Sequence, residues 1–263
     1  MANQVPVHLF DLHSTLPIPS KAWSPNTLKT RLALNYKGIP YTQTYVSYPD
    51  IAPLLKSLSV PPNPEGTAST ASWTLPAIQH SGGAIMGSLP IARYLEKQFP
   101  ERPLFPSGNV SYAIAVAVDR IMSLVGFALY ELIVPRIKDI LDPRAQEYYE
   151  RTRSAMFGKP VADVRPTDER EIQQMIDKAK KEMMTIVEML KGNSAKAGPF
   201  LEGEQPSYAD FIVIAYLTWY KTADGNIWKQ LIELGDGELR TLWDAVSPWV
   251  AGQGEDKEWD IPQ

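Results

Sequence analysis

The sequence predicts two domains of different class: an α/β domain over residues 1–107 and an all-helical domain over residues 108–263. Short strand patterns alternate with helical ones up to about residue 100, whereas only long helical periods follow. Prolines at positions 100, 103 and 106 punctuate the boundary, which indicates a linker. With 263 residues the chain is long enough to bury a core in each domain.

The first domain begins with a β-α-β pattern. Alternating apolar positions over 5–13 predict a half-buried strand. Ser24 and Pro25 mark a helix start, because serine is a preferred N-cap and a proline at the first helical position loses only an amide that has no helical partner. Gly38 ends this helix. The threonine- and tyrosine-rich run 41–46 then predicts a second strand.

The remainder of this domain is expected to consist of shorter elements. A helix over 49–58 is followed by a proline-rich loop over 59–72. Strands over 75–79 and 84–86 are joined by a Ser-Gly-Gly turn, which indicates a hairpin. Ser88 is expected to cap a helix that runs to Phe99. The predicted order is therefore β-α-β-α-β-β-α.

The second domain is predicted from helical periodicity alone. The expected helices cover residues 112–140, 145–156, 167–191 and 207–220. The last of them opens with Ser207 and Asp210 in the spacing of a capping box. We assign these two residues to folding and not to catalysis.

Composition excludes several classes of function. The chain has 26 basic and 30 acidic residues, hence a formal net charge of −4, which argues against nucleic acid as a main partner. The absence of cysteine removes disulfides, thiolate zinc sites and cysteine nucleophiles, and with only 3 histidines no metal site is expected. No signal peptide and no run approaching about 18 apolar residues is found, so a cytosolic protein without a membrane span is expected.

The order of elements and four local motifs resemble the glutathione transferase superfamily, over nearly the whole chain. Leu75 and Pro76 match the cis-proline loop of its thioredoxin-like N-terminal domain. Gly87 and Ser88 match the helix start that binds the γ-glutamyl carboxylate of glutathione. Ser24 matches the catalytic serine of the serine-type classes, and the capping box matches that of a core helix in the family's helical domain.

The resemblance implies that glutathione is the co-substrate and binds the first domain. Many family members have an acidic residue or glutamine where this chain has Gly87, so that contact with the ligand's ammonium group is absent here or supplied elsewhere. The basic residue for the glycyl carboxylate has no clear match, and Lys37 and Lys56 are the candidates. The residues expected to bind glutathione are Trp23, Asn26, Leu75, Pro76, Gly87 and Ser88.

Finer detail resembles one branch of the family. The run from Trp23 to Thr27, with Arg31 and Lys37 further on, is similar to the basidiomycete fungal A class, whose relatives include bacterial glutathione-dependent β-etherases. That similarity implies serine-type glutathione chemistry on hydrophobic aromatic compounds, a role in detoxification, binding of plant-derived polyphenols and a homodimer.

Ser24 is expected to act as a hydrogen-bond donor to the thiolate of glutathione and not as a nucleophile. A hydroxyl donor and the positive end of a helix both favour an anion, and Asn26 would orient Ser24 or donate to the sulfur itself. Taken alone, Ser24 is explained better as an ordinary helix cap, because Ser-Pro is common at helix starts, and the surrounding order of motifs reverses that preference. The substrate pocket is expected between the domains, with Met122, Phe127 and Tyr130 as candidate walls, although residues at helical spacing are more often core.

Three functions remain open from the sequence. The first is a glutathione transferase that conjugates hydrophobic aromatic compounds or cleaves them reductively. The second is a non-catalytic or weakly catalytic carrier of polyphenols and other hydrophobic ligands. The third is a transferase-like scaffold whose helical domain binds another protein.

Overall fold

The computed structural model describes residues 7–65, 71–193 and 196–262. Its first domain contains, in chain order, β1 (Val7–Leu12), α1 (Pro25–Lys37), β2 (Tyr41–Val46), α2 (Ile51–Ser57), β3 (Ala77–His80), β4 (Gly83–Met86) and α3 (Ser88–Gln98). This order confirms the predicted β-α-β-α-β-β-α pattern. The expected loop over 59–72 has neither helix nor strand where it is described, and its residues 66–70 lie outside the described part, as does Val5 of the first expected strand.

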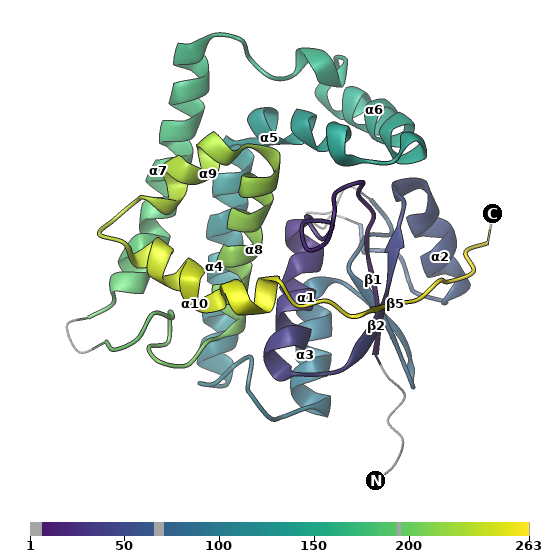
Figure 1. The fold of residues 1–263 in the computed structure, drawn as a ribbon, viewed down its shortest axis with the longest axis horizontal. Helices are drawn as coiled ribbons and strands as arrows, with labels where there is room; N and C mark the ends of the chain where they lie inside the picture. The colour runs from purple at the N-terminus through teal and green to yellow at the C-terminus, as the bar shows by residue number, and fades with distance from the viewer. Residues whose placement is uncertain (1–6, 66–70, 194–195, 263) are drawn as a thin grey trace.

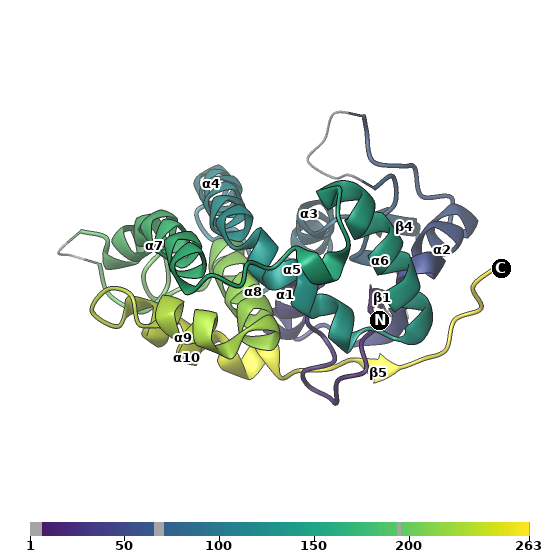
Figure 2. The same ribbon diagram turned by 90° about the horizontal axis from the view of Figure 1, so that it is seen from above.

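The sheet has the strand order β4-β3-β1-β2-β5. β1 runs parallel to β2 and antiparallel to β3, and β3 and β4 form the predicted hairpin. All six residues of β1 are buried, so the prediction of a half-buried strand was wrong, because β1 lies in the centre of the sheet. Helices α1 and α3 lie between the sheet and the helical domain, and α2 lies on the other side (Figures 1 and 2). The loop from β1 to α1 therefore lies at the boundary between the domains.

The second domain is a bundle of helices, as predicted. It contains α4 (Asn109–Ala128), α5 (Tyr130–Ile137), α6 (Pro143–Phe157), α7 (Glu169–Lys191), α8 (Tyr208–Ala223), α9 (Gly225–Ile232) and α10 (Glu238–Val250). The capping box at the start of α8 is confirmed, with the backbone N–H of Ser207 donating to the Asp210 carboxylate at 2.7 Å. Helix α8 packs against α1 of the first domain and so joins the two domains.

The single helix expected over 112–140 is wrong, because two helices occupy this stretch. α4 ends at Ala128, Leu129 leaves helical geometry at φ −99° and ψ 3°, and α5 begins at Tyr130. Both helices are apolar on their inward faces, so the periodicity continues across the break and does not reveal it. Pro135 lies within α5 and removes one amide donor from this second helix.

Helix α4 is long and apolar enough to cross a membrane by length and composition, which the sequence analysis did not anticipate. In the structure it packs against α7 and α8, and 33% of its most apolar window is buried. The core helix of a water-soluble protein has the same length and composition, so this property alone carries little weight.

The segment after α10 departs from the all-helical expectation. It returns to the first domain, where the two residues of β5 (Glu255–Asp256) pair in parallel with β2 and extend the sheet (Figure 1). A strand of two exposed residues has no periodicity that a sequence pattern can reveal. The tail thus covers the outer edge of β2, which would otherwise expose unpaired backbone groups.

A fully buried arginine holds the tail, the sheet and α1 together. Arg31 of α1 donates from Nη2 to Asp11 of β1 at 2.7 Å, and both side chains are completely buried. From Nη1 it donates to Gln43 of β2 at 2.6 Å and to Gln253 of the tail at 2.9 Å. Three neighbouring segments of the first domain and the distant tail therefore converge on one guanidinium group.

The tail also covers a buried histidine. His8 of β1 hydrogen-bonds through Nδ1 to Thr42 at 2.7 Å and through Nε2 to Thr44 at 2.9 Å, and the Trp259 ring packs on it. The Thr44 hydroxyl donates to the backbone oxygen of Lys257, so it accepts from His8, whose Nε2 carries the proton. Burial and the nearby charge of Lys257 lower the pKa of His8 to about 4.

We expect this histidine to make the protein sensitive to mild acid. In the unfolded chain the pKa of His8 returns to about 6.5. Between pH 6.5 and 4 the unfolded state is therefore protonated at His8 while the folded state is not, so the free energy of unfolding decreases as pH falls through this range. The full shift is worth about 3 kcal/mol, and with partial solvation we expect a loss of about 1–2 kcal/mol. Urea unfolding of the wild type and His8→Gln at pH 7 and pH 5 measures it; a pH dependence identical in both proteins would contradict the assignment.

Candidate active site

Ser24 lies at the start of α1, where the loop after β1 meets the helical domain. Its backbone is extended at φ −69° and ψ 130°, and Pro25 follows at the first helical position, which confirms the predicted helix start. The carbonyl of Ser24 accepts from Leu28, but its hydroxyl makes no capping hydrogen bond. The hydroxyl, on a residue only 5% exposed, is therefore not engaged in the cap that would explain it as purely structural.

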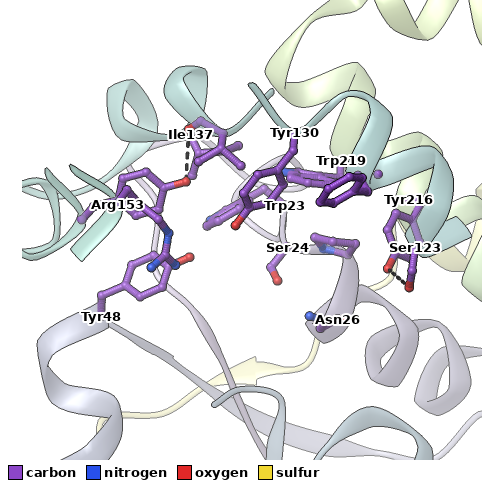
Figure 3. A pocket seen from close by; sticks show the side chains of 15 residues that line it. Trp23, Ser24, Asn26, Tyr48, Ser123, Tyr130, Ile137, Arg153, Tyr216 and Trp219 are labelled. Carbon is purple, nitrogen blue, oxygen red and sulfur yellow. Dashed lines mark hydrogen bonds between the residues drawn. The ribbon is translucent and has the colours of Figure 1, made fainter. Parts of the chain in front are cut away.

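Asn26 is held beside Ser24 in the first turn of α1. Its side-chain oxygen accepts from Lys29 at 3.2 Å, and Lys29 in turn pairs with Asp119 of α4 at 2.6 Å. Because the oxygen is directed to a cation, the amide group of Asn26 is left as a donor on the side of Ser24 (Figure 3). An interdomain ion pair thus fixes the orientation of a potential thiolate donor.

Two cavities meet at Ser24. The aromatic cavity, of about 330 Å³, lies between α1 and the helical domain (Figure 3). The strand-side cavity, of about 240 Å³, lies between α2, the segment before β3 and α6. Four residues line both cavities: Ser24, Asn26, Tyr48 and Arg153. A ligand in one cavity would therefore lie next to a ligand in the other, with Ser24 at the junction.

The segment before β3 forms one wall of the strand-side cavity. The Leu75–Pro76 peptide bond is cis, as the resemblance implies, and Leu75 lines the cavity. The carbonyl of Pro76 accepts from the N–H of Gly87 at 2.9 Å, which links this segment to the start of α3. Thr74 and Trp73 complete the same wall.

The start of α3 differs in detail from the expectation. Gly87 occupies the N-cap position with φ +96°, a conformation that favours glycine, and Ser88 is the first helical residue and makes no capping bond. The prediction of Ser88 as the cap was therefore wrong, because the strained turn after β4 needs glycine at that position. Neither residue is among those that line the two cavities.

Only two of the three predicted substrate-pocket residues line a cavity in the structure. Phe127 and Tyr130 line the aromatic cavity, together with Trp23. Met122 is fully buried in the core and lines neither cavity. Phe127 is 73% exposed, so it forms the rim and not the floor. Met122 and Phe127 are five positions apart in α4, which places them on different faces of the helix.

Neither lysine candidate for the glycyl carboxylate lines a cavity. The ammonium of Lys37 is buried and donates to the carbonyl of Phe99 at 2.7 Å, and it pairs with Glu96 at 2.9 Å. It therefore ties the end of α1 to the end of α3 and is not available to a ligand. Lys56 lies over the ring of Trp73 at 4.6 Å, behind the wall of the strand-side cavity.

The sequence analysis missed the polar and aromatic residues that the helical domain and the β2–α2 connection contribute. Tyr48, Arg153 and Trp219 all line the aromatic cavity. Arg153 lies in α6 among other charged residues, so nothing in the pattern distinguishes it from a solvated helix face. Trp219 lies in a helix that is apolar almost throughout, where it is indistinguishable from core.

The cavity perturbs the acid–base behaviour of its tyrosines. Burial raises the pKa of Tyr48 to about 12, although the charge of Arg153 acts in the opposite direction. Burial likewise raises the pKa of Tyr149, whose hydroxyl donates to the carbonyl of Val134 at 3.1 Å. Both phenols therefore stay protonated at neutral pH, and Tyr48 presents a hydrogen-bond donor to the cavities.

Family models match both domains of the chain. Residues 23–98 match the glutathione S-transferase N-terminal domain, and residues 113–249 match the glutathione S-transferase C-terminal domain. The glutathione S-transferase-like protein ustS of Aspergillus flavus is 48% identical over 270 residues, which cover 99% of this chain and 97% of that protein.

Solved structures of fungal proteins share the fold. A glutathione S-transferase of Ceriporiopsis subvermispora in complex with glutathione is 29% identical, with a TM-score of 0.82 over 93% of this chain and 98% of that one. Glutathione transferase GSTFuA3 from Phanerochaete chrysosporium is 27% identical, with a TM-score of 0.81 over 94% of this chain and 98% of that one. The similarity thus extends over both domains.

Proposed function

Because the chain belongs to the glutathione S-transferase family, with glutathione as its co-substrate, we propose that it is a serine-type transferase in which Ser24 activates the thiol. The observation that carries this proposal is the Ser24 hydroxyl, which is not used in helix capping and lies where the two cavities meet. Glutathione would occupy the strand-side cavity, and a hydrophobic aromatic acceptor the aromatic cavity.

The chemistry needs a stabilised thiolate. A free thiol with a pKa near 8.5 is only a few per cent ionised at neutral pH. Lowering this pKa by about two units requires roughly 2.7 kcal/mol, which the Ser24 hydroxyl, the Asn26 amide and the first-turn amides of α1 supply together. The thiolate then attacks an electrophilic carbon of the acceptor, a carbon–sulfur bond forms, and the leaving group departs with its electron pair. Reductive cleavage would need two glutathione molecules: the first thiolate displaces the leaving group of an ether- or ester-type bond, and a second thiolate attacks the sulfur of the resulting thioether. The carbon then takes up a proton, and glutathione disulfide is released.

The family resemblance implies further contacts of glutathione with the first domain, of which those at Gly87 and Ser88 lie outside the residues that line the two cavities. The backbone of Leu75 would hold the cysteinyl part, and the N-terminus of α3 at Gly87 and Ser88 would hold the γ-glutamyl carboxylate, since a helix N-terminus favours an anion. Trp23, whose indole donates to the carbonyl of His13 at 3.5 Å, would close the cavity above the sulfur.

Ionisation of bound glutathione tests the role of Ser24. We expect the ultraviolet thiolate absorbance of glutathione mixed with wild type, titrated from about pH 5 to 9, to appear well below the pKa of the free thiol. Ser24→Ala should move that transition back toward the free value and lower turnover by about 10- to 100-fold. Ser123→Ala removes another cavity hydroxyl, which lies 3.4 Å from that of Tyr216, and should leave the transition unchanged. Bound glutathione that ionises in wild type as it does in water would rule out the serine mechanism.

A carrier function is the second candidate, and the walls of the aromatic cavity favour it. Seven of its 15 lining residues are aromatic: Trp23, Tyr48, Phe127, Tyr130, Tyr149, Tyr216 and Trp219. Such walls bind flat polyphenols by stacking as readily as they position an acceptor. A carrier would keep its polyphenol affinity in Ser24→Ala and show no turnover in wild type, which separates the two functions in the same experiment.

We also propose that the protein is a cytosolic homodimer. Val110, Val116 and Leu124 are exposed apolar residues on one face of α4, at 61%, 45% and 37%. Such a stripe on a surface helix favours burial against a second copy. A native mass of a single chain by light scattering would contradict the dimer.

A further inference from the structure

Arg153 occupies an unusual position between the two cavities. It extends from α6 into the site, lines both cavities and lies beside Tyr48, on the side opposite Tyr216 (Figure 3). Its guanidinium is 4.8 Å from the ring centre of Tyr149 and 5.9 Å from that of Tyr48. Two aromatic rings therefore fix the direction of a permanent positive charge at the junction that Ser24 also lines.

This charge has no acidic partner. Among the described residues, no Asp or Glu lies within ion-pair distance of Arg153, and the undescribed positions contain neither. The acids nearest in sequence to Arg153 and Tyr48 are Glu150 and Asp50, and both are engaged elsewhere. Glu150 pairs with Lys138 at 2.6 Å, and Asp50 pairs with Arg144 at 2.7 Å. Its partners among the described residues are uncharged: it donates to Thr152 Oγ1 at 3.3 Å and contacts the two tyrosines. An anion that binds here would add the charge compensation that these partners do not supply.

A second donor points to the same kind of ligand. Tyr48, whose hydroxyl stays protonated, lines both cavities beside Arg153. A guanidinium fork and a phenol side by side suit an oxyanion, and a carboxylate accepts from an arginine through two parallel hydrogen bonds. Most other residues that line the aromatic cavity are apolar or aromatic, and its further polar members, Ser24, Asn26 and Ser123, are uncharged. The anion would therefore be one end of an otherwise hydrophobic or peptide-like molecule.

We propose that Arg153 recognises a carboxylate of the bound substrates and makes the site selective for substrates that carry one. The proposal rests on the transferase function proposed above. Two molecules can supply the carboxylate: an acidic aromatic acceptor in the aromatic cavity, or the glycyl end of glutathione in the strand-side cavity. Arg153 is in either case a specificity-determining residue that the helical domain contributes and that neither lysine candidate replaces.

The experiment compares Arg153→Gln with wild type on matched charged and neutral substrates. The acceptors are 4-chloro-3,5-dinitrobenzoate and its methyl ester; the thiolate displaces chloride from both, so only the carboxylate differs. The thiols are glutathione and glutathione with its glycyl carboxylate esterified. Arg151→Gln is the control, because Arg151 lies on the same helix over the Tyr148 ring at 5.4 Å but lines neither cavity.

Loss of one charge-assisted pair predicts a rise of about 10- to 100-fold in KM for the charged member, with little change for its neutral counterpart. If KM rises only for 4-chloro-3,5-dinitrobenzoate, Arg153 binds the carboxylate of the acceptor. If KM rises only for unesterified glutathione, Arg153 binds the glycyl carboxylate. Arg153→Lys should recover part of the loss, since an ammonium keeps the charge but not the fork. Equal effects on charged and neutral members, or an effect equal to that of Arg151→Gln, would overturn the proposal.

Equilibrium binding separates this proposal from the transferase function. The unreactive 3,5-dinitrobenzoate and its methyl ester should quench the fluorescence of Trp23 and Trp219, which line the aromatic cavity. If wild type turns over neither acceptor but Arg153→Gln selectively weakens binding of the benzoate, the transferase function fails while the role of Arg153 stands. If turnover proceeds and no charged ligand is discriminated, the transferase function stands and the role of Arg153 fails. Circular dichroism of each variant confirms that it is folded.

Discussion

Replacing Asp11 with alanine is expected to lower the free energy of unfolding by about 3–5 kcal/mol. The Asp11 carboxylate accepts from Arg31 Nη2 at 2.7 Å, from Arg31 Nε at 3.2 Å and from the backbone N–H of Leu12 at 2.7 Å. Both side chains of the pair are completely buried, so the variant leaves an arginine charge without a counterion in the interior. Urea unfolding at pH 7, followed by circular dichroism, measures the change.

The matched control is Asp50→Ala. Asp50 also pairs with an arginine at 2.7 Å, but the side chain of that residue, Arg144, is 65% exposed. A pair in water contributes far less than a buried one, so the control should unfold close to wild type. A loss in Asp11→Ala no greater than in Asp50→Ala would mean that Arg31 finds other compensation, for which Gln43 and Gln253 are the available acceptors.

Replacing Asp210 with alanine is expected to cost about 2–4 kcal/mol, because it leaves two backbone donors without a partner. The Asp210 carboxylate accepts from the N–H of Ser207 at 2.7 Å and from the N–H of Leu201 at 2.8 Å. It also accepts from the Ser207 hydroxyl at 2.9 Å, and both residues of the capping box are fully buried. The start of α8, the helix that packs on α1, therefore depends on this one side chain.

The effect of Asp210 should depend on pH with a definite sign. Burial raises its pKa from 3.8 to about 6, so the folded state holds a proton between these values that the unfolded state has released. The stability gap between wild type and Asp210→Ala should therefore narrow as pH rises from about 4 to 6. Asp168→Ala serves as the control, since Asp168 caps α7 through Arg170 N–H at 2.8 Å in an exposed position and should cost about 1 kcal/mol. Equal losses in the two variants would contradict the argument.

The parts of this fold that depend on local periodicity could be predicted from the sequence. The β-α-β pattern, the start of α1 at Pro25 and the capping box at Ser207 all depend on residues within a few positions of one another. The break at Leu129 was missed because it leaves the apolar pattern intact. β5 was missed because its two residues pair with β2, more than 200 positions away. Long-range pairing leaves no local signal.

The candidate site was predictable only where a motif surrounds the residue. Ser24, Asn26 and Leu75 were found through their place beside a helix start or a proline, and the structure brings all three to the walls of the strand-side cavity. Arg153 could not be found this way, because its neighbours in α6 are charged residues at a solvated surface. Lys37 was misjudged for the converse reason, since its partners are the Glu96 carboxylate and backbone carbonyls after α3, which no sequence pattern reveals.

The path of the tail has a consequence for the order in which the chain can mature during synthesis. Domains generally fold as units, the N-terminal one first, as the ribosome releases them. Here the sheet of the first domain receives its last strand at residues 255–256, and Gln253 is the acceptor that completes the hydrogen bonding of Arg31. Until those residues emerge, β2 remains an open edge able to pair with another nascent chain. The first domain is thus synthesised first but completed last. The helical domain must leave the ribosome before β5 can complete the sheet that supports the site around Ser24.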